Sequence, residues 1–108
     1  MYNHIEVTLV AYERTQDTDG YEVLVPYETV LVGFEKSVKY NEFYTALQAG
    51  IKPTRVVSLY NLEYEEAYHN SNEPEVCIID GIRYKIVRVY STDAYRCEIT
   101  LEKEMHNG

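Results

Sequence analysis

The side chains that most often perform catalysis or bind metals are few in this sequence and lie far apart. The three histidines are His4, His69 and His106, and no two of them have the spacing of ligands on one helix or hairpin. Cys77 and Cys97 form no CxxC pair, and the four serines lack the context of an activated nucleophile. The sequence therefore predicts no catalytic site, no metal site and no cofactor, and we expect a protein that is not an enzyme.

Charged residues give two weaker signals. Acidic residues gather between positions 63 and 75, where Glu63 and Glu65 would share one face if the stretch is a strand. Such a face could hold a hard cation or line a channel, although an acidic run is more commonly a solvated surface.

A second stretch, residues 82–90, alternates Arg83, Lys85 and Arg88 with Tyr84 and Tyr90, as in a stacking platform for single strands. On a regular strand, however, Arg83 and Lys85 face one side, while the tyrosines share the other side with Arg88.

The net charge of −8, from 18 acids and 10 bases, argues against a protein that grips nucleic acid by neutralising phosphates. It is compatible with a surface past which DNA moves without sticking.

The chain of 108 residues has the size of one domain, spanning residues 1–108, and its 45% hydrophobic content is typical of a folded protein. Twelve tyrosines and no tryptophan suit strand faces that meet water or another subunit. Two cysteines do not make a disulfide scaffold, so a reducing compartment is expected. Because no signal peptide and no apolar run long enough for a bilayer are evident, we expect a protein made in the cytoplasm without membrane contact.

The elements that would position these residues are mostly strands. Period-two alternation and strand-forming residues predict extended segments over 5–12, 21–38, 54–68, 76–79, 82–90 and 95–102. Residues 17–20 form a turn signal, Asp80-Gly81 is a strong hairpin signal, and Pro26 marks an edge, a bulge or a bend. One change of period, with a possible N-cap at Asn41, predicts a short helix over residues 41–50. About six short strands favour an antiparallel barrel or sandwich with one inserted helix.

Two motifs resemble the phage head–tail joining family, whose members are also called head-closure, stopper or head–tail adaptor proteins. The first is NEFYTALQAGIKP at residues 41–53, and the second is GIRYKIVRVY at residues 81–90. Between them, LEYEE at residues 62–66 occupies the place of an acidic family segment. In order and spacing, the resemblance covers residues 7–102.

The resemblance implies a small antiparallel β-barrel of about six strands with one short helix, assembled as a ring, in the form of a dodecamer, in the virion. The ring would close the DNA channel after packaging and provide the platform for tail attachment. Its implied partners are portal and adaptor ring proteins, tail proteins and further copies of itself, although the isolated subunit could be monomeric. Double-stranded DNA would pass through the channel without sequence-specific binding.

Residue roles follow from the same motifs. Tyr44, Ile51, Lys52 and Arg88 are the expected interface or channel residues, and Arg88 would need a carboxylate partner if it is buried. The segment between positions 37 and 54 is the expected channel gate. The structural residues of the two motifs are Glu42, Phe43, Leu47, Gly50, Pro53, Gly81, Tyr84, Ile86 and Tyr90.

Two other functions stay open at this point. A tail-completion or tail-terminator protein of the same virion is also a small β-rich ring subunit. An OB-like nucleic-acid-binding module would instead require salt-dependent binding to single strands.

Overall fold

The computed structural model of the protein describes residues 3–36 and 55–104. These residues form strands β1 (Asn3–Gln16), β2 (Glu22–Lys36), β3 (Arg55–Tyr60), β4 (Val76–Ile79), β5 (Ile82–Ser91) and β6 (Arg96–Lys103), with helix α2 (Asn61–Glu66) between β3 and β4. The helix predicted over residues 41–50 lies outside the described residues.

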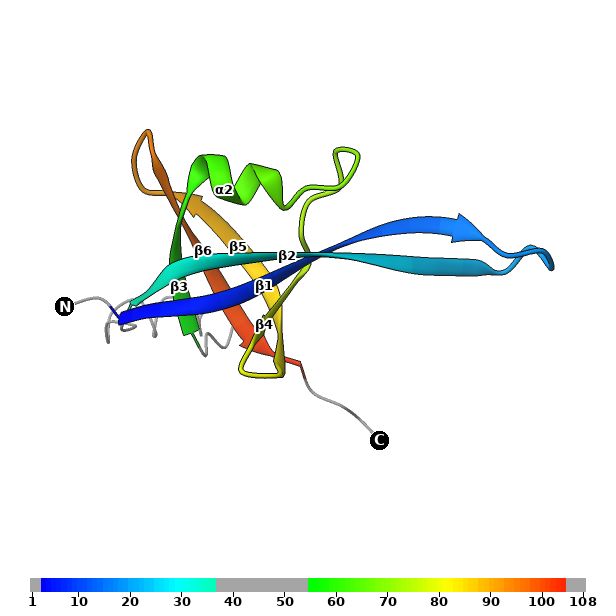
Figure 1. Ribbon diagram of the computed structural model, residues 1–108, viewed down its shortest axis with the longest axis horizontal. Helices are drawn as coiled ribbons and strands as arrows, with labels where there is room; N and C mark the ends of the chain where they lie inside the picture. Colours follow the sequence, from blue (N-terminus) through cyan, green and yellow to red (C-terminus); the bar gives the residue numbers. More distant parts are fainter. Residues whose placement is uncertain (1–2, 37–54, 105–108) are drawn as a thin grey trace.

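The six strands close into a barrel with the neighbour order β1-β2-β3-β6-β5-β4, and every pair is antiparallel. Closure depends on β1, which pairs with β2 along one edge and with β4 along the other. The predicted mainly-β fold, a small antiparallel barrel with one short helix, is confirmed (Figure 1). Closure covers the backbone edges only where neighbouring strands are paired.

The first hairpin is longer than the barrel. Strands β1 and β2 stay paired from Asn3↔Glu35 to Gln16↔Glu22, but β1 contacts β4 only between Thr8 and Val10. Beyond that point the two strands leave the barrel as a two-stranded ribbon, visible in blue and cyan in Figure 1. We call residues 12–26 the arm.

A tight turn joins the two strands of the arm. One oxygen of the Asp17 carboxylate accepts hydrogen bonds from the N–H groups of Asp19 and Tyr21, each at 2.9 Å. Gly20 has φ +86°, a conformation that glycine adopts without steric cost. The turn predicted at residues 17–20 is thus confirmed. Pro26 lies where β2 is paired on one side only, which is the edge position open to a residue without an N–H.

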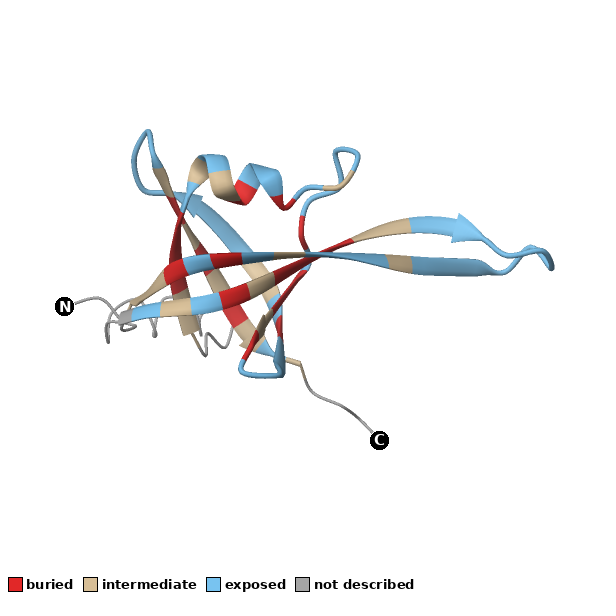
Figure 2. Ribbon diagram, in the orientation of Figure 1, coloured by how far each residue is buried: buried red, intermediate tan, exposed pale blue. Residues whose placement is uncertain are grey.

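The core consists of side chains that point inward from alternate positions of the strands. Figure 2 shows these buried residues as red bands along the barrel and the arm as mostly exposed. On β6, Cys97, Ile99 and Leu101 are buried, as their alternation with polar residues predicts. The other members of the cluster are Val7, Leu9, Leu31, Val57, Leu59, Tyr64, Ala67, Cys77, Ile79 and Tyr84.

The prediction of extended structure over residues 54–68 is wrong in its second half. Strand β3 ends at Tyr60, and α2 follows directly. Tyr64 and Ala67, three positions apart, are both buried, so they join the core from one helical face and the helix covers one end of the barrel. Glu63 and Glu65, two apart on a helix, do not form the shared acidic face that a strand would give them.

The hairpin predicted around Asp80-Gly81 is confirmed. Asp80 and Gly81 have φ +50° and +77°, and they join β4 to β5 through the Ile79↔Ile82 pair. Two consecutive positive φ values are the requirement of the tight turns that match strand twist.

Candidate functional site

The structure describes only part of the residue set that the sequence motifs single out. Tyr44, Ile51 and Lys52, the expected interface residues, lie outside the described residues. The same holds for the first motif's structural residues: Glu42, Phe43, Leu47, Gly50 and Pro53. The second motif is fully described, because it covers the turn residue Gly81 and most of β5.

Strand β5 does not keep the regular alternation that the sequence predicts. Tyr84 is buried and Ile86 packs against the core, but a β-bulge between Ile86 and Arg88 inserts one extra residue. Arg88 therefore changes face, and it is exposed with its guanidinium 5.4 Å from the centre of the exposed Tyr90 ring. The expectation that Arg88 and Tyr90 share the face of Tyr84 is wrong, and no buried carboxylate partner is needed for Arg88.

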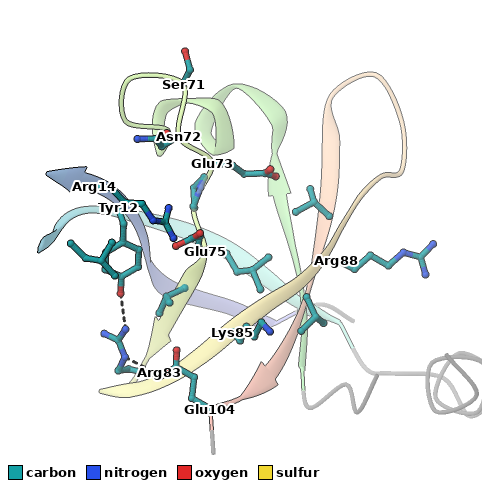
Figure 3. A pocket seen from close by; sticks show the side chains of 16 residues that line it. Tyr12, Arg14, Ser71, Asn72, Glu73, Glu75, Arg83, Lys85, Arg88 and Glu104 are labelled. Carbon is teal, nitrogen blue, oxygen red and sulfur yellow. Dashed lines mark hydrogen bonds and ion pairs between the residues drawn. The ribbon is translucent and has the colours of Figure 1, made fainter. Parts of the chain in front are cut away.

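A groove of about 870 Å³ lies where the arm leaves the barrel (Figure 3). The outer face of the arm forms one wall through Tyr12, Arg14 and Leu24. The loop from Ser71 to Glu75 borders the groove, and β5 lines it with Arg83, Lys85, Ile86, Val87, Arg88 and Val89. Three segments that are distant in sequence therefore line the groove.

Charged residues of both signs line the groove: Arg14, Arg83, Lys85 and Arg88 are basic, and Glu73, Glu75 and Glu104 are acidic. Arg83 donates a hydrogen bond to the Tyr12 hydroxyl at 2.7 Å and pairs with Glu104 at 3.2 Å, which raises the pKa of the guanidinium. Within residues 3–36 and 55–104, Lys85 and Arg88 form no ion pair. These two cations are available to a ligand that carries carboxylates or phosphates.

Two sets of contacts hold the loop beside the groove. The buried Tyr64 of α2 donates a hydrogen bond from its hydroxyl to the Glu73 carboxylate at 2.7 Å, and burial together with this bond raises the pKa of Tyr64. The His69 ring stacks on Tyr27 at 3.4 Å between centroids, and its Nε2 lies 3.1 Å from the Glu13 carboxylate. Glu73 thus ties the loop to the helix, and His69, just before the loop, contacts the base of the arm.

The other reactive groups among the described residues are the cysteines and the residue types that bind metals. Cys77 and Cys97 are buried and unpaired, and burial raises the pKa of the Cys77 thiol to about 12. No three His, Cys, Asp or Glu side chains among residues 3–36 and 55–104 lie close enough together to hold a metal ion. Over the same residues, no helix is both long and apolar enough to cross a membrane.

No model of a protein family and no curated protein matches the sequence.

Sequence reasoning missed the arm and the groove. The available signal is that the predicted extended segment 21–38 is much longer than the segment 76–79. The predicted first strand, over 5–12, is too short, whereas β1 and β2 have 14 and 15 residues and β4 has 4. A barrel closed by so short a strand cannot enclose the whole of the first hairpin, so part of the hairpin must project.

Proposed function

We propose that this chain is a structural subunit of a tailed phage or prophage and forms a ring at the junction between head and tail. The ring closes the DNA channel after packaging and offers the tail its attachment platform. The observation that carries the proposal is the closed antiparallel barrel, together with the second family-like motif, which begins at the turn residue Gly81 and includes the buried Tyr84.

Two ion pairs hold the C-terminal end of β2 and the N-terminal end of β3. These two strand ends are joined by residues 37–54, the segment that carries the first motif and is the proposed gate. Lys36 pairs with Glu98 of β6 at 2.9 Å, and Arg55 pairs with Glu35 of β2 at 2.7 Å, all four side chains being partly buried. Charge-assisted contacts of this kind hold strand ends in register, so force on the joining segment would reach the barrel.

The charge of the chain supports a conduit rather than a binding protein. With a net charge of −8, the protein repels phosphates on average, which lets DNA pass without being trapped. Duplex binding at low salt tests this point. Only weak binding is expected, and submicromolar affinity contradicts the conduit.

Electron microscopy of particles made after inactivation of this one gene tests the proposal directly. The expected result is tailless heads that have lost their DNA, alongside free finished tails. Aberrant tails on sound heads would assign the protein to tail completion instead. Normal virions would remove it from the structural pathway and favour a nucleic-acid-binding module.

A deletion of residues 39–52 tests the proposed gate separately. The ion pairs that flank the segment lie outside the deletion, so the barrel is expected to fold, as circular dichroism and thermal unfolding can verify. Particles assembled with the shortened protein should then fail to retain DNA. Normal virion yield from a folded deletion variant contradicts the gate.

A further inference from the structure

Two strands of the barrel present backbone edges that no described residue pairs. Strand β2 pairs with β3 only between Phe34 and Lys36, so from Glu22 to Gly33 it is paired with β1 alone. Strand β5 pairs with β4 up to Lys85, followed by one bond from the Ile86 N–H to the Glu75 carbonyl. Beyond that bond β5 is paired with β6 alone. Unpaired edges of this kind are templates for adding another strand.

The arm and the neighbouring part of β2 expose apolar side chains that a monomer would normally cover. Tyr21 at the tip is 71% exposed, and Val30 and Val32 are 59% and 53% exposed. Leu24 and Val23 are exposed on the same strand. Of these residues, Tyr21, Val23 and Leu24 lie on the projecting arm, whereas Val30 and Val32 lie on the barrel part of β2, opposite Thr8 and Glu6. Exposed apolar residues on a projecting ribbon are a marker of a protein–protein contact.

The groove has a free strand edge, apolar lining and basic residues, which complement the edge, the apolar side chains and the acidic residues of the arm. The unpaired edge of β5 from residue 87 onward lies at the groove, where Val87 and Val89 give apolar lining and Lys85 and Arg88 give positive charge that no described carboxylate neutralises. The arm carries the opposite charge, with four acids and one base between residues 12 and 26: Glu13, Asp17, Asp19, Glu22 and Arg14. Both features therefore have a strand edge that no described residue pairs, and Lys85 and Arg88 of the groove complement an arm with an excess of acidic residues.

We propose that the arm of one copy of this chain lies in the groove of a second copy, with the β2 edge of the arm added to the free edge of β5. The arm cannot reach the groove of its own barrel with its tip, because it extends away from the barrel (Figure 1). The contact joins two different surfaces of the chain. Two copies that exchange arms form a closed dimer, whereas repetition of the contact from copy to copy generates the ring of the proposed function. The same contact joins the subunits of the proposed ring, but it requires only self-association and not a place in a virion.

Chemical cross-linking of the purified full-length chain tests this contact. Tyr21→Cys places a thiol at the tip of the arm and Val89→Cys places one in the groove, while Cys77 and Cys97 are buried, at 0% and 2% exposure. A mixture of the two variants treated with a short bis-maleimide should give a cross-linked dimer. The double variant should give a ladder of multimers, because each copy then carries both halves of the contact.

Tyr95→Cys is the control for the groove position, because Tyr95 does not line the groove and is more exposed than Val89, at 77% against 38%. Cross-linking of Tyr21→Cys to Val89→Cys no faster than to Tyr95→Cys overturns the proposal. Faster linkage between two copies of Tyr21→Cys also overturns it, since the arms would then pair with each other.

Charge reversal separates this contact from a general stickiness of the surface. Lys85→Glu with Arg88→Glu in the Val89→Cys partner should slow cross-linking about tenfold, because like charges then face each other. Asp19→Lys with Glu22→Lys in the Tyr21→Cys partner should restore the rate. Failure of this exchange to restore the rate contradicts the proposed pairing of arm and groove.

A single-stranded oligonucleotide is the competing occupant. Suppose that the oligonucleotide binds the wild-type chain but not the Lys85→Glu, Arg88→Glu variant, and that Tyr21→Cys and Val89→Cys do not cross-link. The groove is then a nucleic-acid site and the proposal is wrong. The cross-linking uses protein alone, whereas the junction role is judged by the particles lacking the gene. Either conclusion can therefore fail without the other.

Discussion

Replacement of Gly33 by alanine tests how closely β2 and β3 approach inside the barrel. A Cβ built at this position would lie 2.7 Å from Leu59 Cδ2, 2.7 Å from Val57 Cγ1 and 3.0 Å from the Ser58 carbonyl oxygen. All three distances are shorter than ordinary van der Waals contact. Val57 and Leu59 are fully buried, and the carbonyl belongs to a strand of the barrel, so none of the three atoms can move away easily.

The expected cost follows from these distances. Overpacking a tight core typically costs about 1–3 kcal/mol, and alanine regains about 0.5–1 kcal/mol over glycine through the lower entropy of the unfolded chain. Gly33→Ala should therefore lower the free energy of unfolding by about 1–2 kcal/mol, which urea unfolding should report as a lower midpoint with an unchanged m-value.

A double-mutant cycle identifies the cause. Leu59→Val removes the Cδ2 atom that the new Cβ would meet, so the cost of Gly33→Ala should be smaller in that background. If Gly33→Ala is neutral, the close approach is not what requires glycine here. Equal costs in the two backgrounds would assign the cost to Val57 and the Ser58 carbonyl, which Leu59→Val leaves in place.

Three further predictions each concern the replacement of a single residue. Tyr64→Phe removes the 2.7 Å hydrogen bond to Glu73 and should cost about 1–2 kcal/mol in urea unfolding, with an unchanged midpoint counting against the bond. Burial raises the pKa of the Cys77 thiol to about 12 in the folded protein. Between pH 9 and 12 the thiol is therefore deprotonated in the unfolded chain but still protonated in the folded one, so the free energy of unfolding falls by about 1.4 kcal/mol per pH unit as pH rises. Cys77→Ala should remove that part of the slope, and equal slopes in both proteins would refute the assignment. Gly81→Ala forces a side chain onto φ +77° and should cost about 1 kcal/mol, seen as a lower melting temperature than that of wild type.

The strands could be predicted from the sequence wherever one face is buried and the other is exposed to solvent. Cys97, Ile99 and Leu101 alternate with polar residues, and the barrel buries all three. The turn at Asp80-Gly81 could be predicted because its conformation is local, requiring positive φ at two adjacent residues.

The helix α2 could not be separated from a strand by its apolar residues alone. Leu62 and Tyr64 are two positions apart, as on a strand, but Leu62 is 76% exposed and contributes nothing to the core. The pair that decides the conformation is Tyr64 with Ala67, whose spacing is helical and whose burial depends on the open end of the barrel. A six-residue helix gains most of its stability from such tertiary contacts, which a local pattern does not contain.

A β-bulge determines which face of β5 carries Arg88, and no local pattern in the sequence predicts this bulge. One inserted residue reverses every later side chain of the strand, so Arg88 and Tyr90 reach the surface instead of the core. The residues before the bulge, Tyr84 and Ile86, keep the predicted face.

The arm and the groove share one structural cause, which is the shortness of β4. Pro74 is buried just before β4 begins, and without an N–H it cannot extend the ladder toward the N-terminus of that strand. Because β4 starts only at Val76, β1 loses its second partner after Val10 and β5 loses its own partner after Ile86. The first loss releases the arm from the barrel, and the second leaves the edge of β5 open at the groove. A chain that creates a projecting strand pair and an unfilled strand position by the same interruption is equipped to fill that position in a neighbouring copy.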